Sequence, residues 1–167
     1  MHLIIPKDYN PVLNTRDTEI AIKLVKDFFE RELARQLNLT RVSAPIMVTP
    51  QSGLNDNLNG VERPVDFDIL ETGERAEIVH SLAKWKRMAL KTYGFAPGEG
   101  LYTDMNAIRR DEITDNIHSI FVDQWDWERI LTPQERNEAT LRAIVEKIYE
   151  TLQATEDHVC AHYPHIT

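Results

Sequence analysis

The chain has 167 residues, of which 42% are hydrophobic and 28% are charged, and its formal net charge at pH 7 is −8. This length and composition are typical of one globular domain, so we expect a single domain over residues 1–167. The acidic balance argues against general binding to nucleic acid or to a membrane surface. The sequence has one cysteine, Cys160, which excludes an intrachain disulfide framework. With neither a signal peptide nor an apolar run of bilayer length, we expect a cytoplasmic protein.

The first third of the chain predicts a helix, a strand and a loop. Apolar residues that recur every three or four positions predict a helix over residues 17–37. These residues are Ile20, Leu24, Phe28, Leu33 and Leu37. Residues 39–48 predict a strand, which Pro45 restricts to an edge, an end or an interface. The Asn- and Gly-rich residues 51–60 predict a loop.

The rest of the chain also predicts strands, helices and a loop. Residues 64–70 alternate apolar and acidic side chains and predict a half-buried strand, with residues 75–80 as its hairpin partner. A helix is expected over residues 80–93, and two more strands flank the polar loop 109–118. The last helix is predicted to open with a capping box at residues 132–135. Its expected buried stripe is Leu141, Ile144, Ile148 and Leu152. Strands joined by hairpins and bordered by helices predict an antiparallel α+β domain.

The segment FVDQWDWER, residues 121–129, combines aromatic rings with carboxylates. In a strand, alternation places Phe121, Asp123, Trp125 and Trp127 on one side, which we expect to be largely aromatic core. Gln124 and Asp126 lie on the other side. That side either meets water or forms the floor of a polar pocket, where Gln124 offers an acceptor and Asp126 an anion for a ligand ammonium group.

Lys86 and the arginine pair Arg109 and Arg110 also allow either a solvent-exposed position or a place in a ligand pocket. Lys86 lies in the middle of the apolar face of the helix 80–93, whereas Lys84 and Arg87 lie on the face expected to be solvated. The Lys86 side chain either extends to solvent or holds its ammonium for a carboxylate or phosphate. Arg109 and Arg110 end a strand, where arginines are usually exposed, but one that points into a pocket suits forked contact with a phosphate.

The remaining patterns do not identify a metal site or a known catalytic motif. Neutral amides at alternate positions of the loop 55–60 argue against a calcium site, and Asp56 is either a turn-forming residue or a functional carboxylate. Cys160 is expected to be a small buried apolar side chain. The sequence has no glycine-rich nucleotide motif, zinc spacing or Ser/His/Asp elbow, so we expect no protein-held metal.

Four longer segments together carry a resemblance. NDNLNGVERPV, EIVHSLAKWKR, GEGLYTDMNAIRRDE and HSIFVDQWDWER closely resemble the ammonia-dependent asparagine synthetases, also called aspartate–ammonia ligases. That family resembles the catalytic core of class II aminoacyl-tRNA synthetases. The resemblance implies an antiparallel sheet flanked by helices in a homodimer, with the first helix and the Pro45 strand as the dimer-forming motif.

The resemblance covers nearly the whole chain, yet the family continues beyond it. Its later half carries a second aspartate-rich stretch and a Gly-rich segment that ends in an ATP-gripping arginine, and neither has a counterpart here. The chain therefore resembles the N-terminal half of a catalytic domain. A shortened chain, a gene fragment and a degenerate paralogue remain open, and we expect little activity from this chain alone.

The family joins L-aspartate and ammonia with ATP, and it releases asparagine, AMP and pyrophosphate through β-aspartyl-AMP. In that scheme Lys86 meets a carboxylate of aspartate, and Arg109 holds the α-phosphate. Gln124 and Asp126 orient the amino acid, with Asp126 at its α-ammonium, and Asp56 helps to take a proton from ammonia. Mg²⁺ is expected to bridge phosphate oxygens. The alternatives are a non-catalytic ligand-binding or interaction module, and an amino-acid-activating enzyme that acts on tRNA.

Overall fold

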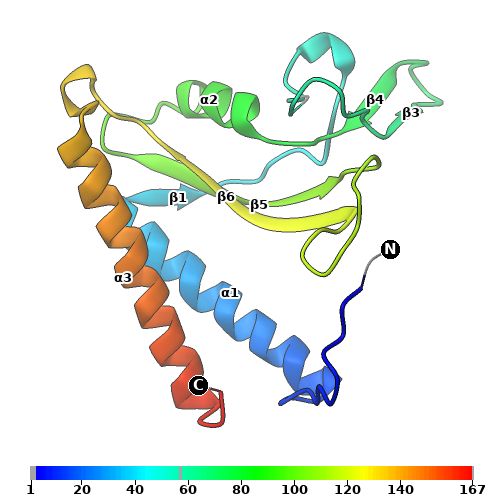
Figure 1. The fold of residues 1–167 in the computed structure, drawn as a ribbon. Helices are drawn as coiled ribbons and strands as arrows, with labels where there is room; N and C mark the ends of the chain where they lie inside the picture. Colours follow the sequence, from blue (N-terminus) through cyan, green and yellow to red (C-terminus); the bar gives the residue numbers. More distant parts are fainter. Residues whose placement is uncertain (1–2, 57, 167) are drawn as a thin grey trace. The chain divides into compact units, whose positions relative to one another are not determined.

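The computed structural model describes residues 3–56 and 58–166, and in them it confirms an α+β architecture (Figure 1). The helices are α1 (Thr15–Leu37), α2 (Ala83–Thr92) and α3 (Glu138–His162), with short 3-10 turns η1 (Pro50–Ser52) and η2 (Pro133–Glu135). The strands are β1 (Leu39–Arg41), β2 (Met47–Val48), β3 (Asp66–Asp68), β4 (Arg75–Ile78), β5 (Gly100–Ile108) and β6 (Phe121–Arg129). They form sheets in the orders β1-β5-β6 and β2-β4-β3.

Two compact units make up the chain. Within the described residues, the first contains residues 3–5, 41–95 and 101–128, and the second contains 6–40, 96–100 and 129–166. Among these residues, no helix has the length and apolarity needed to cross a membrane.

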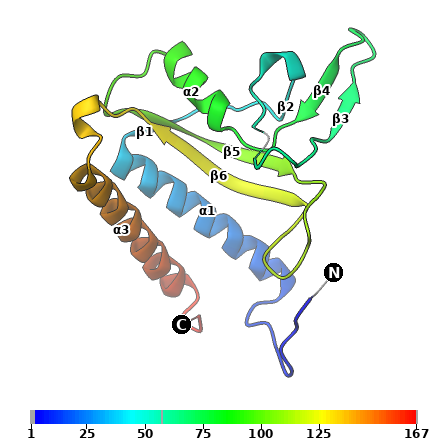
Figure 2. The ribbon, with the colours of Figure 1, turned by 45° about the horizontal axis from the view of Figure 1, so that its top comes forward.

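In the second unit, α1 and α3 lie side by side, as both views of the ribbon show (Figure 2). Asn14 caps α1 by accepting a hydrogen bond from Asp17 N at 2.9 Å, and Asn38 ends the helix in the left-handed conformation. Leu33 and Leu37 are each 1% exposed, as expected, and the Phe28 ring stacks on His158.

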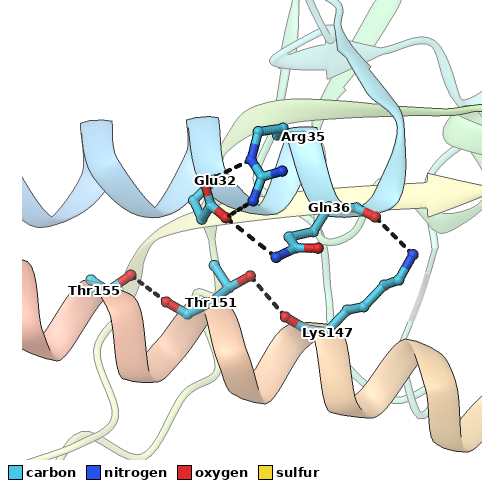
Figure 3. A network of polar contacts seen from close by, with 6 residues as sticks. All are labelled: Glu32, Arg35, Gln36, Lys147, Thr151 and Thr155. Carbon is cyan, nitrogen blue, oxygen red and sulfur yellow. Dashed lines mark hydrogen bonds and ion pairs between the residues drawn. The ribbon is translucent and has the colours of Figure 1, made fainter.

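The apolar stripe predicted for α3 is wrong in its details. Thr151 and Thr155 are buried, whereas Leu141 and Leu152 are 61% and 52% exposed. The two threonine hydroxyls donate to carbonyl oxygens four residues earlier, so their burial leaves no unpaired hydroxyl donor (Figure 3). Ile20 of α1 is also exposed, at 52%. Apolar spacing alone does not show which side of a helix its neighbour covers.

The capping box predicted at Thr132 exists, but it does not open the long helix. Thr132 Oγ1 accepts from Glu135 N, and the Glu135 carboxylate accepts from Thr132 N. These bonds close the turn η2, whereas α3 begins at Glu138, where Asn137 accepts from Thr140 N. Two helix-start patterns therefore follow each other within six residues.

The small sheet of the first unit confirms the predicted hairpin. β4 lies between β2 and β3, with Met47 opposite Ile78 and Phe67 opposite Ala76, all antiparallel. The strand predicted over residues 39–48 is interrupted at Pro45, which lies between β1 and β2. The prediction of one strand is therefore wrong, because residues 42–46 separate two short strands that belong to different sheets.

The long hairpin of β5 and β6 positions the site. The two strands run in opposite directions, and Arg109 N donates to Ile120 O at 2.8 Å where they meet the loop (Figure 2). Leu101, Thr103, Met105 and Ala107 are buried along one face of β5. On the opposite face the rings of Tyr102 and Trp125 lie 4.8 Å apart. Phe121 was predicted as core on that face, and this prediction is wrong, because Phe121 is 56% exposed at the start of β6.

Helix α2 is shorter than predicted. It begins at Ala83 and not near His80, whose backbone N–H donates to Asn55 Oδ1 at 2.9 Å. Trp85, Lys86, Ala89 and Leu90 form its buried face, whereas Tyr93, placed on that face by spacing, is 54% exposed at the helix end.

Candidate active site

Lys86 is buried inside the first unit, with 6% of its surface exposed. Its Nζ donates to Asp126 Oδ1 at 2.5 Å and to Trp127 O at 2.9 Å. Glu128 Oε2 is 3.5 Å away. The sequence left open whether the Lys86 side chain extends to solvent or holds its ammonium inside the protein, and the first alternative is wrong. The ammonium is held inside the protein against the end of β6.

Asp126 and Gln124 share one face of β6. Side chains alternate along a strand, and Asp126 and Glu128, two residues apart, both lie close to Lys86 of α2. Gln124 is half-buried on the same face. The aspartate is therefore not simply solvated, since its side chain is 17% exposed.

Arg109 belongs to the same face of the hairpin. Because its N–H bonds to the carbonyl of Ile120, the two residues lie opposite each other, and opposite residues project from the same face. Alternation then places Gln124 and Asp126 on the face of Arg109. Gln124 is four residues along β6 from Ile120, or about 13 Å. A long arginine side chain and a small ligand can span that interval.

Arg109 also lines a cavity of about 410 Å³ in the first unit. Its charged lining consists of Glu62, Arg63, Arg109, Arg110, Asp111 and Glu112, and both His80 and His118 contribute to its wall. A lining with several guanidinium groups suits an anionic ligand such as a phosphate.

The three arginines of this cavity are not equivalent. Arg63 binds Asp111 through Nη2, through Nε at 3.1 Å and through its backbone N at 2.9 Å. Those hydrogen bonds lower the pKa of Asp111 well below its usual range. Arg110 donates to Pro64 O at 3.3 Å. Arg109 Nε, in contrast, is buried with no hydrogen-bond partner among the described residues.

Asp56 lies half-buried beside an anchored residue. Asn55 is 7% exposed, and its Nδ2 donates to Glu77 Oε2 at 3.0 Å while its Oδ1 accepts from His80 N. Lys84, expected on a solvated face, donates to Asn55 O at 3.2 Å. These bonds fix the start of the loop that carries Asp56. Asn57, the next residue of that loop, lies outside the described residues.

His80 is the residue that sequence reasoning missed. It is 0% exposed, and neither ring nitrogen has a hydrogen-bond partner within residues 3–56 and 58–166. The pattern that could have marked it is an ionisable ring directly after the apolar pair Ile78 and Val79 at the end of a predicted strand. Cys160 is half-buried, and its Sγ donates to Ile166 O at 3.4 Å.

The fold is shared with class II aminoacyl-tRNA synthetase-like proteins. A pyrrolysyl tRNA synthetase from Desulfitobacterium hafniense matches 83% of this chain and 50% of its own, with a TM-score of 0.51 and 14% sequence identity. An ATP phosphoribosyltransferase regulatory subunit/histidyl-tRNA synthetase from Bacillus halodurans matches 87% of this chain and 38% of its own, with a TM-score of 0.56 and 12% identity. At these identities the likeness shows the fold alone.

Sequence comparison gives the family. An aspartate–ammonia ligase from Ruminiclostridium cellulolyticum is 64% identical over 165 residues, which cover 98% of this chain and 49% of the relative. Relatives of the same name from Fusobacterium nucleatum and Lactobacillus acidophilus are 60% and 59% identical and covered to 48% and 49%. The chain thus spans about half the length of these relatives. The aspartate-ammonia ligase family model matches residues 16–167, and the chain therefore belongs to the aspartate–ammonia ligase family.

Proposed function

We propose that this chain supplies the part of an aspartate–ammonia ligase that binds L-aspartate and the α-phosphate of ATP. The complete reaction joins ammonia to L-aspartate and gives L-asparagine, AMP and pyrophosphate. The observation that carries the proposal is the buried ion pair of Lys86 and Asp126, on the hairpin face that also holds Gln124 and Arg109. We further propose that the chain is the N-terminal portion of the catalytic domain, since it spans about half of its relatives.

The ion pair suits an amino-acid substrate because that substrate carries both charges. L-Aspartate brings an α-ammonium and two carboxylates. Its ammonium can replace Lys86 at the Asp126 carboxylate, and one carboxylate can replace Asp126 at the Lys86 ammonium. Each buried charge keeps an opposite partner during this exchange, so neither is left uncompensated. Gln124, on the same face, offers amide donors and an acceptor that can orient the amino acid.

The first chemical step activates aspartate. An oxygen of its β-carboxylate attacks the α-phosphorus of ATP, the bond from that phosphorus to the bridging oxygen breaks, and pyrophosphate leaves with the electron pair. Negative charge accumulates on the α-phosphate oxygens, and the Arg109 guanidinium can stabilise it through forked hydrogen bonds.

Mg²⁺ fits this site as an ion carried by the phosphates. Among the described residues no group of three His, Cys, Asp or Glu side chains could hold a metal ion, whereas Mg²⁺ usually keeps waters and binds substrate phosphates. Glu62 and Glu112 of the cavity wall could hold its water shell. When bound, the ion would supply charge neutralisation of the phosphates.

The second step opens β-aspartyl-AMP. Ammonia attacks the β-carbonyl carbon, the carbon–oxygen bond to AMP breaks, and the nitrogen loses a proton. We propose Asp56 as the carboxylate that helps to take this proton. Its half-buried position beside the anchored Asn55 supports that role, because the loop start is fixed by bonds to Glu77 and His80.

The wider setting follows the family. We propose a cytoplasmic enzyme, because a chain with one cysteine is suited to a reducing compartment. We also propose a homodimer. Exposed apolar side chains three residues apart on α1, Ile22 at 47% and Val25 at 36%, support an interface on the first helix, and sedimentation of the purified protein tests it.

The test of function uses a chimera, because the relatives are about twice as long as this chain. The 167 residues are joined to the unmatched half of the Ruminiclostridium cellulolyticum ligase, which is 64% identical over the matched half. We expect formation of asparagine and AMP from aspartate, ammonia and ATP. Asp126→Asn should raise the KM for aspartate strongly, whereas Asp104→Asn, at a surface pair with Arg41, should not. An active chimera that is indifferent to Asp126→Asn would contradict the proposed aspartate site.

A second candidate is a ligand-binding or interaction module without catalysis, which the half-length match favours. It predicts that the chimera binds aspartate and nucleotide but releases neither AMP nor asparagine. An enzyme that acts on tRNA is disfavoured by the net charge of −8. Transfer of labelled aspartate to tRNA by the chimera would reverse that preference.

A further inference from the structure

His80 is the most fully enclosed ionisable side chain at the cavity of Arg109. It is 0% exposed, it forms part of the cavity wall, and within the described residues neither Nδ1 nor Nε2 has a hydrogen-bond partner. Buried polar atoms are nearly always paired in native proteins, so two unpaired nitrogens on one ring require an explanation. Arg109 Nε, in the same cavity wall, is also buried and unpaired.

The backbone of His80 is held firmly, so its ring is not a loose side chain. His80 N donates to Asn55 Oδ1 at 2.9 Å, and Val79 N donates to Ile46 O at 3.0 Å. Asn55 is bound in turn to Glu77 and to Ile78 O. The ring therefore projects from an anchored segment toward the cavity, as expected of a group that is prepared for a ligand.

Three other polar side chains of the cavity wall have partners. Arg63 binds Asp111, Glu62 accepts from Asn59 at 3.0 Å, and His118 Nδ1 lies 2.9 Å from Asp115 Oδ1. His80 and Arg109 are the cavity residues with buried donor atoms that lack a partner in the part of the chain that the structure describes.

We propose that His80 binds the phosphate of the nucleotide, by donating one imidazole N–H to a phosphate oxygen that Arg109 also contacts. This inference rests on the proposed function, which places a nucleotide phosphate in the cavity. An imidazole always carries at least one N–H, so the bond forms in either protonation state. Both nitrogens are closed to solvent without ligand, so binding shifts a side chain of the cavity wall.

The test follows the histidine rings of the chimera described above, as the parent protein, by nitrogen NMR during titration with AMP, pyrophosphate and adenosine. AMP and pyrophosphate should move the His80 ring resonances to a saturating value, whereas adenosine, which lacks the phosphate, should leave them in place. His80→Leu should weaken AMP binding about 10- to 100-fold, in the range of a hydrogen bond to a charged group. His80→Gln, whose amide can donate, should recover part of this loss.

His162→Gln is the control, because His162 is an exposed histidine of α3 that does not line this cavity. It should change AMP affinity less than about fivefold. A structural role for His80 would instead lower the melting temperature of His80→Leu without an AMP-specific shift in the parent protein.

The outcomes separate this inference from the proposed function. The His80 site alone would be overturned if the parent protein binds AMP without a shift of the His80 resonances. Normal AMP binding by the His80→Leu variant would overturn it as well. If pyrophosphate shifts the His80 resonances of the parent protein and AMP does not, the phosphate contact is supported. The same result counts against the proposed nucleotide site. A parent protein that binds neither ligand would overturn both.

Discussion

The α1–α3 helix pair of the second unit and the hairpin face of the first unit differ in how their polar side chains are hydrogen-bonded. In the helix pair, several polar side chains bind partners within four residues along the chain, while Lys147 Nζ donates across the pair to Gln36 O at 3.2 Å (Figure 3). Thr151 Oγ1 donates to Lys147 O, and Glu32 accepts from Arg35 and Gln36 (Figure 3). On the hairpin face, Lys86 pairs with Asp126, 40 residues away, and Arg109 Nε is unpaired among the described residues.

If the proposed function holds, the difference separates polar groups that stabilise the fold from polar groups that bind a ligand. Local hydrogen bonds of the helix pair cost little chain entropy and leave little unsatisfied. A buried charge pair is weak evidence for stability, because desolvation offsets much of its attraction. Under the proposed function, the buried charges and unpaired donors of the first unit serve ligand binding, whereas apolar burial should dominate stability in the second.

The largest expected effect tests the apolar part of that contrast. Leu33→Ala should lower the free energy of unfolding by about 2–5 kcal/mol, because Leu33 of α1 is 1% exposed. Leu141→Ala is the control, since Leu141 is 61% exposed, and it should change stability by less than about 0.5 kcal/mol. Urea unfolding followed by circular dichroism measures both. Equal losses would mean that the Leu141 face of α3 is covered in solution.

The next effect concerns Lys86 in the chimera. Lys86→Met keeps the apolar stem and removes the charge, so folding should be unchanged or slightly improved. The kcat/KM for aspartate should fall at least about 10- to 150-fold, which corresponds to about 1.5–3 kcal/mol for a lost charged hydrogen bond. Lys86→Arg should not restore activity, because a guanidinium fork is wider than an ammonium.

Lys91→Met, at an exposed lysine in the last turn of α2, is the control for this substitution. It should leave aspartate kinetics unchanged. Normal kinetics in Lys86→Met would assign Lys86 to structure, as a partner for Asp126 and nothing more.

The sequence predicted most of what local patterns determine. The hairpin strands, the buried Leu33 and the anomalous position of Lys86 all follow from alternation and helical spacing. The α+β class followed as well. Family resemblance then assigned expected roles to Asp56, Arg109, Gln124 and Asp126, which the chimera is designed to test.

What the sequence missed depends on tertiary context. The spacing of Leu141 and Leu152 shows an apolar stripe but not which face of α3 meets α1, and the buried threonines reveal that face afterwards. Phe121 is aromatic yet exposed, since nothing within the described part of the hairpin covers it. His80 carries no motif, and its importance rests on two unpaired nitrogens that become visible when the chain is folded.

A smaller effect concerns the start of α3. Asn137→Ala should cost about 1 kcal/mol of unfolding free energy, because Asn137 Oδ1 accepts from Thr140 N at the first turn of a 25-residue helix. Thr132→Ala should cost less, because it caps the three-residue turn η2. Thermal unfolding of the two variants measures the order. A larger loss for Thr132→Ala would show that the capping box holds more than its own turn.

The smallest effect concerns the cavity arginine that is already paired. Arg63 lowers the pKa of Asp111, so this carboxylate stabilises the folded state above its unfolded pKa of about 3.8 and loses that contribution as pH falls toward its folded pKa. Arg63→Ala should return the pKa of Asp111 toward 3.8, as carboxyl-carbon NMR would measure. Stability should then depend less steeply on pH below 4, and Asp111→Asn should flatten the same window. If the pKa of Asp111 stays low without Arg63, Arg110 would be the cause of the lowered pKa. Arg63 would then not be committed to Asp111, and its contrast with Arg109, which the proposed function keeps for a ligand, would need revision.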